Sequence, residues 1–322
     1  MNTIREIAQV LKKIRSATIF THVRPDGDTV GSGMALCRAL ELLGVNCEVV
    51  NEGEVPEKFS FLTGIDRIRS MPSPESEVYV CVDTSDEARL GELQHAFMRA
   101  KAKGKTTINV DHHVSNTRYG KYNFVRERAS NCENIAELIE ALGVKQDKII
   151  SEYLLTGMVT DSGGFSHSDV NGDSFRAAAA CADAGADVNR ITYEVFKKQS
   201  KARSQLYLET LSKLRYYFED QLAISLVEKA ALERYGLRQD ETEGIVDFAL
   251  TVDPVEVSVC LMEVKPEQYK ASFRSKGKVN VNEIARAFGG GGHILASGCM
   301  LFGSKEEVLD RLQFTVSQLG NL

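Results

Sequence analysis

The first 190 residues alternate short apolar runs that suit β-strands with longer stretches that suit α-helices. The expected strands lie at 17–21, 47–51, 78–82 and 107–110. The expected helices lie at 31–43, 92–103, 131–142, 148–159 and 174–184. Alternation of this kind indicates βαβ units, in which consecutive strands form a mostly parallel sheet covered by helices.

The pattern changes after residue 215. Two helical stretches, separated by the polar run 197–201, fill most of 188–214 and read as a connector. Strands are then expected at 222–228, 255–264 and 269–274, and helices at 281–288 and 305–319. Because a chain of 322 residues is too long for a single hydrophobic core, we predict two domains of the α/β class. The predicted parts are a parallel-sheet domain at 1–190, a helical connector at 191–215 and a smaller α/β domain at 216–322.

Composition narrows the class of protein. The hydrophobic fraction of 43% and the charged fraction of 26% are those of an ordinary soluble globular protein. No apolar run is long enough to span a bilayer, and residues 1–15 read as an amphipathic helix, not as a signal peptide. The seven cysteines form no C-x-x-C pair, which favours core thiols in a reducing compartment. We therefore expect a cytoplasmic protein that does not enter the membrane.

The formal net charge of −6 argues against a general nucleic-acid coat. Proteins that bind long duplexes without sequence preference usually carry a basic surplus, because neutralising phosphates drives that binding. A small phosphate-bearing substrate remains compatible with this charge, since metal ions and a few Arg or Lys side chains can bind one phosphate locally.

Four segments of the first half are rich in acids and histidines. They are HVRPDGD at 22–28, VYVCVD at 78–83, INVDHH at 108–113 and TGMVTDSGG at 156–164. Carboxylate and imidazole groups of this kind hold paired divalent ions such as Mg²⁺ or Mn²⁺, which are used to cleave phosphate esters. The candidate residues are His22, Asp26, Asp28, Asp83, Asp111, His112, His113 and Asp161.

Three of these segments place their polar residues directly after an apolar β run. In an open parallel sheet, ligands bind outside the carboxyl ends of the strands, so the three segments are expected at one rim. Each segment alone has an ordinary explanation: P-D-G-D is usually a turn, Asp83 or Asp161 can cap a helix, and His112-His113 can be a surface pair. Their occurrence together in one domain favours the metal site.

The segments HVRPDGDTVGS, VCVDTSD, DHH and TGMVTDSGGF resemble, in order and spacing, the four motifs of the DHH phosphoesterase superfamily. The run SFRSKGKVNVNEIARAFGGGGHILASG at 272–298 resembles the DHH-associated domain, whose hallmark is a G-G-G-H segment. The resemblance spans nearly the whole chain. It is greatest for the short bacterial bifunctional oligoribonuclease/pAp phosphatase (NrnA-like) group.

The resemblance implies two Mn²⁺ ions, with Mg²⁺ or Co²⁺ as substitutes. One ion would be held by His22, Asp26 and Asp83. The second would be held by Asp28, Asp83, His112 and Asp161, so that Asp83 bridges the pair. The resemblance further implies that His113 faces the substrate phosphate, that Asp111 braces the loop, and that the active site lies in the cleft between the two domains.

The second domain contains a candidate substrate-binding group. Consecutive glycines at 289–292 present backbone N–H groups that no Cβ obstructs, and such a stretch can wrap an anion. A flexible loop or a helix C-cap is the ordinary explanation of such a run. Basic residues and a histidine nearby favour phosphate binding, although Lys276 also fits a solvated strand end. The predicted substrate-binding residues are Arg274, Ser275, Lys276, Gly290, Gly291, Gly292 and His293.

These features predict a Mn²⁺-dependent phosphoesterase that hydrolyses short oligoribonucleotides to mononucleotides, and pAp to AMP, with water activated by two metals. Its partners would be short single-stranded RNA or nucleotides, and the resemblance is compatible with a homodimer. A phosphodiesterase for cyclic di-AMP or pApA is the alternative, because the same motifs serve both substrates. A non-catalytic nucleotide sensor is a further alternative, which predicts the loss of metal ligands.

Overall fold

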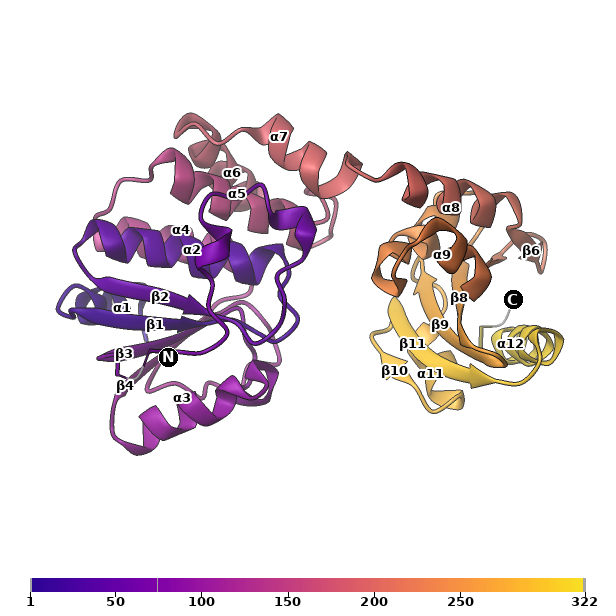
Figure 1. Cartoon of the computed structure of the whole chain (residues 1–322), viewed down its shortest axis with the longest axis horizontal. Coiled ribbons are helices and arrows are strands. Elements are labelled where there is room, and N and C mark those ends of the chain that lie inside the picture. Colours follow the sequence, from indigo (N-terminus) through magenta and orange to yellow (C-terminus); the bar gives the residue numbers. More distant parts are fainter. Residues whose placement is uncertain (1, 74, 321–322) are drawn as a thin grey trace. The chain divides into compact units, whose positions relative to one another are not determined.

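The computed structural model describes residues 2–73 and 75–320, which form two compact units. The first unit runs to Lys198 and the second begins at Gln199. The first ends with α7 (Val188–Thr192) and the π-helical turn η4 (Tyr193–Lys197), and the second opens with α8 (Lys201–Ser212) (Figure 1). The boundary therefore falls inside the segment predicted as a connector.

A five-stranded sheet forms the centre of the first unit, and all its strands are parallel, as predicted. In spatial order the strands are β2 (Asn46–Val50), β1 (Ser16–Phe20), β3 (Val78–Val82), β4 (Thr106–Asp111) and β5 (Tyr122–Val125). Strand β5 was not predicted, because its four residues include only two strongly apolar side chains that could signal a strand.

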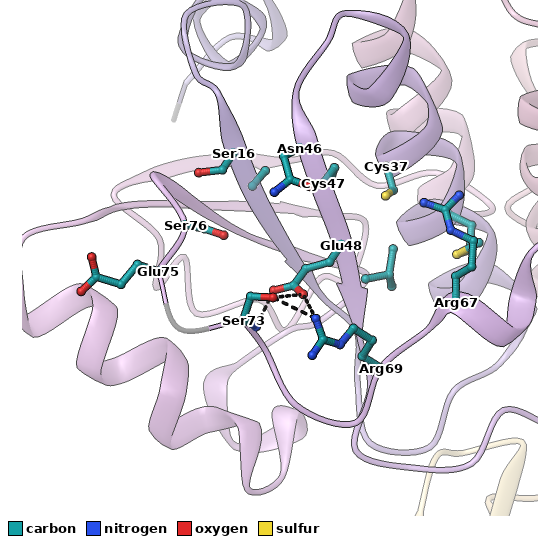
Figure 2. Close-up of a pocket in the computed structure, with 13 residues that line it drawn as sticks. Ser16, Cys37, Asn46, Cys47, Glu48, Arg67, Arg69, Ser73, Glu75 and Ser76 are labelled. Atoms are coloured by element: carbon teal, nitrogen blue, oxygen red, sulfur yellow. Dashed lines mark hydrogen bonds and ion pairs between the residues drawn. The ribbon is translucent and has the colours of Figure 1, made fainter.

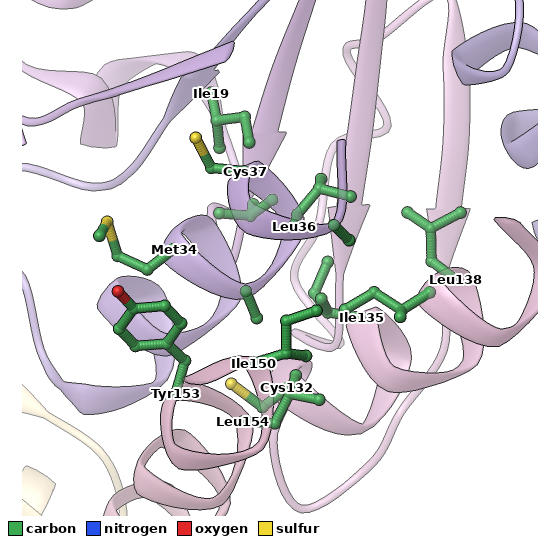
Figure 3. Packing of buried hydrophobic residues seen from close by; sticks show 14 of the residues in the cluster. Ile19, Met34, Leu36, Cys37, Cys132, Ile135, Leu138, Ile150, Tyr153 and Leu154 are labelled. Carbon is green, nitrogen blue, oxygen red and sulfur yellow. The ribbon is translucent and has the colours of Figure 1, made fainter. Parts of the chain in front are cut away.

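Helices cover both faces of this sheet (Figure 1). On one face, α2, α4 and α5 pack together, and Figure 3 shows Leu36, Ile135 and Leu154 meeting in their shared core. On the other face, α3 packs through Phe97 onto Phe20 and Tyr119. The helices are α1 (Ile4–Leu11), α2 (Gly27–Leu42), α3 (Leu93–Ala102), α4 (Asn131–Leu142), α5 (Lys148–Asp161) and α6 (Gly172–Asp183). Short 3₁₀ turns occur at η1 (Glu57–Phe59), η2 (Ile65–Arg67) and η3 (Glu87–Leu90).

Helix α2 begins at Gly27, four residues before its predicted start at residue 31. The side chain of Asp26 provides the cap, because its Oδ1 accepts hydrogen bonds from the backbone N–H groups of Asp28 (3.1 Å) and Thr29 (3.0 Å). The prediction was wrong because the P-D-G-D run was taken for a separate turn. The cap places Asp28 on the first turn of the helix.

Helices α2 and α5 approach each other closely through glycines. A Cβ on Gly31 would lie 2.5 Å from the backbone oxygen of Tyr153, and one on Gly157 would lie 2.3 Å from Sγ of Cys132. Neither position has room for a side chain, so glycine is required here for packing and not for backbone conformation. This close approach carries Asp28 and the end of α5 to the same region.

The second unit is built on a mixed six-stranded sheet. Its order is β10 (Gly291–Gly292), β11 (Ala296–Phe302), β9 (Gln268–Ser275), β8 (Val257–Lys265), β7 (Leu222–Val227) and β6 (Arg215–Tyr217). Only the β7–β8 pair is parallel. The predicted strands correspond to β7, β8 and β9, whereas β6, β10 and β11 were missed. The α/β class predicted for this part is confirmed.

Helices flank the second sheet as well. The elements are α9 (Lys229–Tyr235), η5 (Gln239–Thr242), α10 (Ile245–Ala249), α11 (Val281–Ala287) and α12 (Lys305–Gly320). Its core gathers apolar residues of β7, β8 and β9, such as Leu222, Val259 and Phe273, against Val281 of α11 and Leu312 of α12.

All seven cysteines are buried and none forms a disulfide, which confirms their prediction as core thiols. Among residues 2–73 and 75–320, no helix has both the length and the apolar character needed to cross a membrane.

Candidate metal centre

The polar residues of three segments follow the carboxyl ends of neighbouring parallel strands. Strand β1 ends at Phe20 just before His22, β3 ends at Val82 just before Asp83, and β4 ends at Asp111. Because β3 lies between β1 and β4 in parallel register, these ends share one rim of the sheet.

The first group of ligand atoms surrounds His22. Its Nε2 lies 3.5 Å from Oδ2 of Asp26 and 3.6 Å from Oδ2 of Asp83. The three atoms are all within 4.8 Å of one another, which is the spacing of donors around a single ion. Asp26 uses Oδ1 to cap α2 and therefore presents Oδ2 to this group.

The second group surrounds His112. Its Nε2 lies 3.3 Å from Oδ1 of Asp83, 3.5 Å from Oδ2 of Asp161 and 3.9 Å from Oδ2 of Asp28. Asp161 is the last residue of α5, so the end of that helix brings the fourth segment to the rim. One oxygen of Asp83 faces each histidine, so this carboxylate is common to both groups.

Two buried atoms of these groups are suitable ligands for a metal ion. Nε2 of His22 and Oδ1 of Asp83 are inaccessible to solvent, yet neither has a hydrogen-bond partner. Leaving a polar atom buried without a partner costs about 1–3 kcal/mol. A divalent cation in the first group would satisfy Nε2 of His22, and one in the second would satisfy Oδ1 of Asp83. Carboxylate oxygens and imidazole nitrogens are suitable donors for such ions.

The pKa values of these groups reflect the crowding of acids at this rim of the sheet. Burial alone would lower the pKa of His22 and His112, but the surrounding carboxylates outweigh it and raise the pKa to about 9 and about 11. Burial and repulsion from Asp83 raise the pKa of Asp161 to about 7 and that of Asp28 well above its usual range. Protonation of the two histidines and of one acid thus offsets part of the negative charge that these carboxylates bring together.

The amino terminus of α4 fixes Asp28. Its carboxylate accepts hydrogen bonds from the backbone N–H groups of Asn131 (2.5 Å) and Cys132 (2.8 Å). Ser130 precedes this helix, but its hydroxyl makes no capping bond. The cap comes instead from Asp28, a carboxylate distant in sequence that suits the positive end of the helix dipole.

Hydrogen bonds made by Nδ1 orient the two histidines of the DHH tripeptide. Nδ1 of His112 lies 2.9 Å from the backbone oxygen of Arg128, so it carries the ring proton and leaves Nε2 as the donor for a metal. Nδ1 of His113 donates to Oδ1 of Asp111 (2.8 Å), whose Oδ2 accepts from Asn116 (2.6 Å). Burial would raise the pKa of Asp111, but its hydrogen bonds with His113 and Asn116 outweigh burial and lower it. Asp111 thus lies beside His113, and its carboxylate also belongs to a further group of possible ligand atoms with Asp83, His112 and His113.

Asn116 and Arg89 also contact this centre, although neither was predicted. Asn116 anchors Asp111 and also donates to the backbone oxygen of Thr84 (3.2 Å). Nη1 of Arg89 lies 3.3 Å from Nε2 of His113. Neither has a motif signal of its own, because their contacts depend on how the loops after β3 and β4 meet.

The predicted substrate-binding side chains of the second unit are held by acids. Nε of Arg274 lies 3.0 Å from Oδ1 of Asp247, and Nζ of Lys276 lies 3.3 Å from Oδ1 of Asp253. Ser275 is buried and donates to Oε1 of Glu256 (3.2 Å). The arginine and the lysine are partly exposed and their partners are on the surface, so a phosphate can compete for both.

The glycine run is ordered by backbone hydrogen bonds. The N–H groups of Gly289 and Gly290 donate to carbonyls of α11, as in a helix C-cap. Gly291 and Gly292 form β10, and His293 closes the hairpin to β11 by donating to Ala296 (2.8 Å). Gly290 must be glycine, because its Cβ would lie 2.2 Å from the backbone oxygen of Gly298. The N–H groups of Gly289, Gly290 and His293 are thus already engaged within the hairpin and its cap.

A cavity of about 280 Å³ lies away from all these residues. Figure 2 shows its lining beside Ser16 and Asn46, which begin β1 and β2 and so mark the opposite end of the sheet from the rim. Its polar groups pair with one another, since Glu48 accepts from Arg69 (3.1 Å) and from Ser73 (2.8 Å). The cavity contains none of the predicted site residues.

Comparison with known proteins agrees with this geometry. The profile of the DHH family, N-terminal domain, matches residues 16–160, and that of the DHHA1 domain matches residues 220–319. The bifunctional oligoribonuclease and PAP phosphatase NrnA of Thermus thermophilus is 29% identical, over 99% of this chain and 96% of its own. The cyclic-di-AMP phosphodiesterase GdpP of Bacillus subtilis is 25% identical, over 98% of this chain and 50% of its own. The crystal structure of an exopolyphosphatase-related protein from Bacteroides fragilis superposes with a TM-score of 0.89 and 25% identity, covering 99% and 96% of the two chains.

Proposed function

Because this chain belongs to the DHH phosphoesterase family and continues into a DHHA1 domain, we propose that it hydrolyses short oligoribonucleotides to mononucleotides and pAp to AMP. The chain is a hydrolase by family, and its substrates are the proposal. Support comes from the NrnA relative, whose similarity extends over both domains and nearly the full length of the two chains.

The observation that carries the proposal is the carboxylate of Asp83, which lies between two groups of ligand atoms. We assign one divalent ion to His22, Asp26 and Asp83. We assign the second to Asp28, Asp83, His112 and Asp161. Mn²⁺ is the proposed metal, with Mg²⁺ or Co²⁺ as substitutes, because oxygen-rich sites with some imidazole suit these ions.

When bound, two such ions lower the pKa of water and neutralise charge at phosphorus. The protein contributes the orientation of the reacting groups. Asp111 holds His113 through Nδ1, so that the ring stays at the rim where a phosphate oxygen would lie. Buried Asp28 and Asp83 keep the ligand geometry fixed, and no covalent intermediate with a side chain is required.

Substrate choice is assigned to the second unit. Arg274, Ser275, Lys276 and the hairpin of Gly290, Gly291, Gly292 and His293 would bind the nucleotide part of the substrate. The accessible side chains of Arg274 and Lys276 support this role, since each can exchange a surface carboxylate for a phosphate.

A phosphodiesterase for cyclic di-AMP or pApA is the second candidate. The similarity to the GdpP phosphodiesterase over 98% of this chain favours it. A nucleotide sensor without activity has less support, because all the expected ligand residues are present and face one another.

Product profiling separates these functions. The purified protein is incubated with pAp, pApA, cyclic di-AMP and RNA of graded length, with Mn²⁺ or Mg²⁺, and products are resolved by chromatography. We expect the protein to release AMP from pAp and mononucleotides from RNA a few nucleotides long. Cyclic di-AMP should be cleaved slowly. Rapid cleavage of cyclic di-AMP alone would favour the second candidate. If no substrate is turned over, a non-catalytic nucleotide sensor would be the function that fits.

A further inference from the structure

Arg89 is a basic residue beside the metal centre that the reaction described above does not use. It lies in η3, a few residues after Asp83. Its backbone N–H donates to Oδ1 of Asp86 (3.2 Å), and its carbonyl accepts from the N–H of Val23 (2.8 Å). Since Val23 adjoins His22, the backbone of Arg89 is tied to two of the segments that carry ligand candidates.

The side chain of Arg89 is directed at His113. Nη1 lies 3.3 Å from Nε2 of that ring. A guanidinium group can only donate hydrogen bonds, so Nε2 is the acceptor and the ring proton is on Nδ1, which donates to Asp111. This contact uses one of five N–H donors of the guanidinium, and the side chain is only partly buried, so other donors remain accessible to a ligand.

Arg89 differs from arginines that have a structural role in this protein. Arg38, Arg69 and Arg128 each pair with a carboxylate. The Arg89 guanidinium has no carboxylate partner within 4.0 Å among the residues that the structure describes. Its charge is therefore available to a group that the protein does not itself supply.

The charge of the centre indicates what that group is. The four carboxylates assigned as ligands (Asp26, Asp28, Asp83 and Asp161) balance two divalent ions. Asp111 and a phosphate ester then add negative charge without a counterpart. Guanidinium suits this surplus, because its planar fork of N–H groups matches the oxygens of a phosphate.

We propose that Arg89 is a phosphate-binding residue of this centre, donating to a non-bridging oxygen of the phosphate that His113 faces. The bound oxygen would take the place of Nε2 of His113 as the acceptor for Nη1. The inference rests on the proposed function, and it adds a residue outside the metal ligands and outside the second unit.

Binding of product tests this proposal without turnover. AMP and orthophosphate are titrated calorimetrically into the Mn²⁺-loaded protein and into the variants R89A and R89K. We expect R89A to weaken AMP binding by about 10- to 100-fold, the usual range for a lost charge-assisted hydrogen bond. R89K should lose less, since it keeps a point charge. Arg99→Ala, an exposed arginine of α3, is the matched control and should bind as the wild type does.

Two further readouts exclude a purely structural role. Mn²⁺ stoichiometry and affinity, measured in the same variants, should be unchanged. In turnover of pApA, R89A should lose a similar factor in kcat/KM, and millimolar guanidinium ions should restore part of it. Weakened AMP binding at unchanged Mn²⁺ binding is the combination that a purely structural role would not give.

Several results would overturn the assignment. They are wild-type AMP affinity in R89A, loss of Mn²⁺ binding together with AMP binding, or a wild-type protein that binds neither AMP nor orthophosphate. Failure of the proposed function looks different. A wild-type protein that binds AMP through Arg89 but hydrolyses no nucleotide ester would sink the activity and retain the phosphate site.

Discussion

Oδ1 of Asp83 lies 3.3 Å from Nε2 of His112, where the neighbouring strands β3 and β4 end. Asp83 is 2% exposed and has a φ of 51°, a left-handed conformation that residues other than glycine rarely adopt. Its backbone N–H is held by the carbonyl of Val110 (3.0 Å). The backbone therefore turns sharply here, and the turn aims both carboxylate oxygens at histidines of different segments.

The variant Asp83→Asn should lose metal binding and activity together. It keeps the size of the side chain but replaces one carboxylate oxygen and removes the negative charge that both ions would share. Changes outside the ligand shell already cost 10- to 100-fold in metal affinity, so we expect a loss of at least about 100-fold. Calorimetric titration with Mn²⁺ measures it. Asp183→Asn, at an exposed position of α6, is the matched control, and equal Mn²⁺ binding by the two variants would contradict the bridging role.

Stabilisation by Mn²⁺ should grow as the pH rises. In the metal-free protein the raised pKa values of His22 (about 9) and His112 (about 11) stabilise the fold below pH 6.5, and this is lost as the pH rises through those values. Asp161, with a pKa of about 7, favours its protonated form in the fold, so its ionisation also costs stability as the pH rises from about 4 to 7. Metal binding requires the deprotonated ligands.

Melting temperatures with Mn²⁺ and with a chelator, compared at pH 6 and pH 8, measure this effect. We expect the larger increase at pH 8, and an increase that is at least as large at pH 6 would contradict the assigned ligands. At a free metal concentration of about 100 times Kd, the increase corresponds to about 2.7 kcal/mol. Asp83→Asn should lose most of the metal effect at both pH values.

Asp111→Asn separates a bracing residue from a metal ligand. The amide has only one acceptor oxygen, so it cannot accept from both His113 and Asn116 as the carboxylate does, while the ligand atoms around His22 and His112 stay in place. We expect kcat for pApA to fall by about 10- to 100-fold with Mn²⁺ affinity close to that of the wild type. Loss of Mn²⁺ binding as severe as in Asp83→Asn would instead make Asp111 a ligand.

Gly157→Ala should destabilise the first unit although alanine is the better helix former. Helix propensity alone predicts a gain of about 1 kcal/mol at this interior position of α5. The added Cβ would lie 2.3 Å from Sγ of Cys132 and 2.9 Å from Oδ1 of Asp28, so overpacking should outweigh that gain by about 1–3 kcal/mol. Urea denaturation measures the difference. A variant as stable as the wild type would show that α2 and α5 can separate freely.

Arg274→Ala should raise KM for nucleotide substrates by about tenfold with a smaller change in kcat, as expected for loss of one charged contact to the substrate. Hydrolysis of p-nitrophenyl phosphate, which lacks a nucleoside, should be unaffected. Arg215→Ala, an exposed arginine of β6 in the same unit, is the control. Equal losses on both substrates would indicate that Arg274 does not bind the nucleotide part.

Local patterns predicted most of the framework. Apolar runs identified β1, β3 and β4, and the polar residues directly after them follow from chain connectivity. Strands β5 and β10 were missed because four and two residues are too short for a periodic signal. The start of α2 was misplaced because a cap and a turn use the same residue types.

The candidate metal ligands could be identified from the order of residues alone, since acids and histidines at strand ends in a parallel sheet reach one rim. How these side chains are held follows from the folded arrangement of the chain. Asp28 is fixed by the amino terminus of α4, Asp111 by Asn116, and His113 by Arg89. These partners come from segments that pack side by side only after the helices and loops close on the sheet. No local pattern encodes such contacts, because they depend on distance in space and not on spacing along the chain.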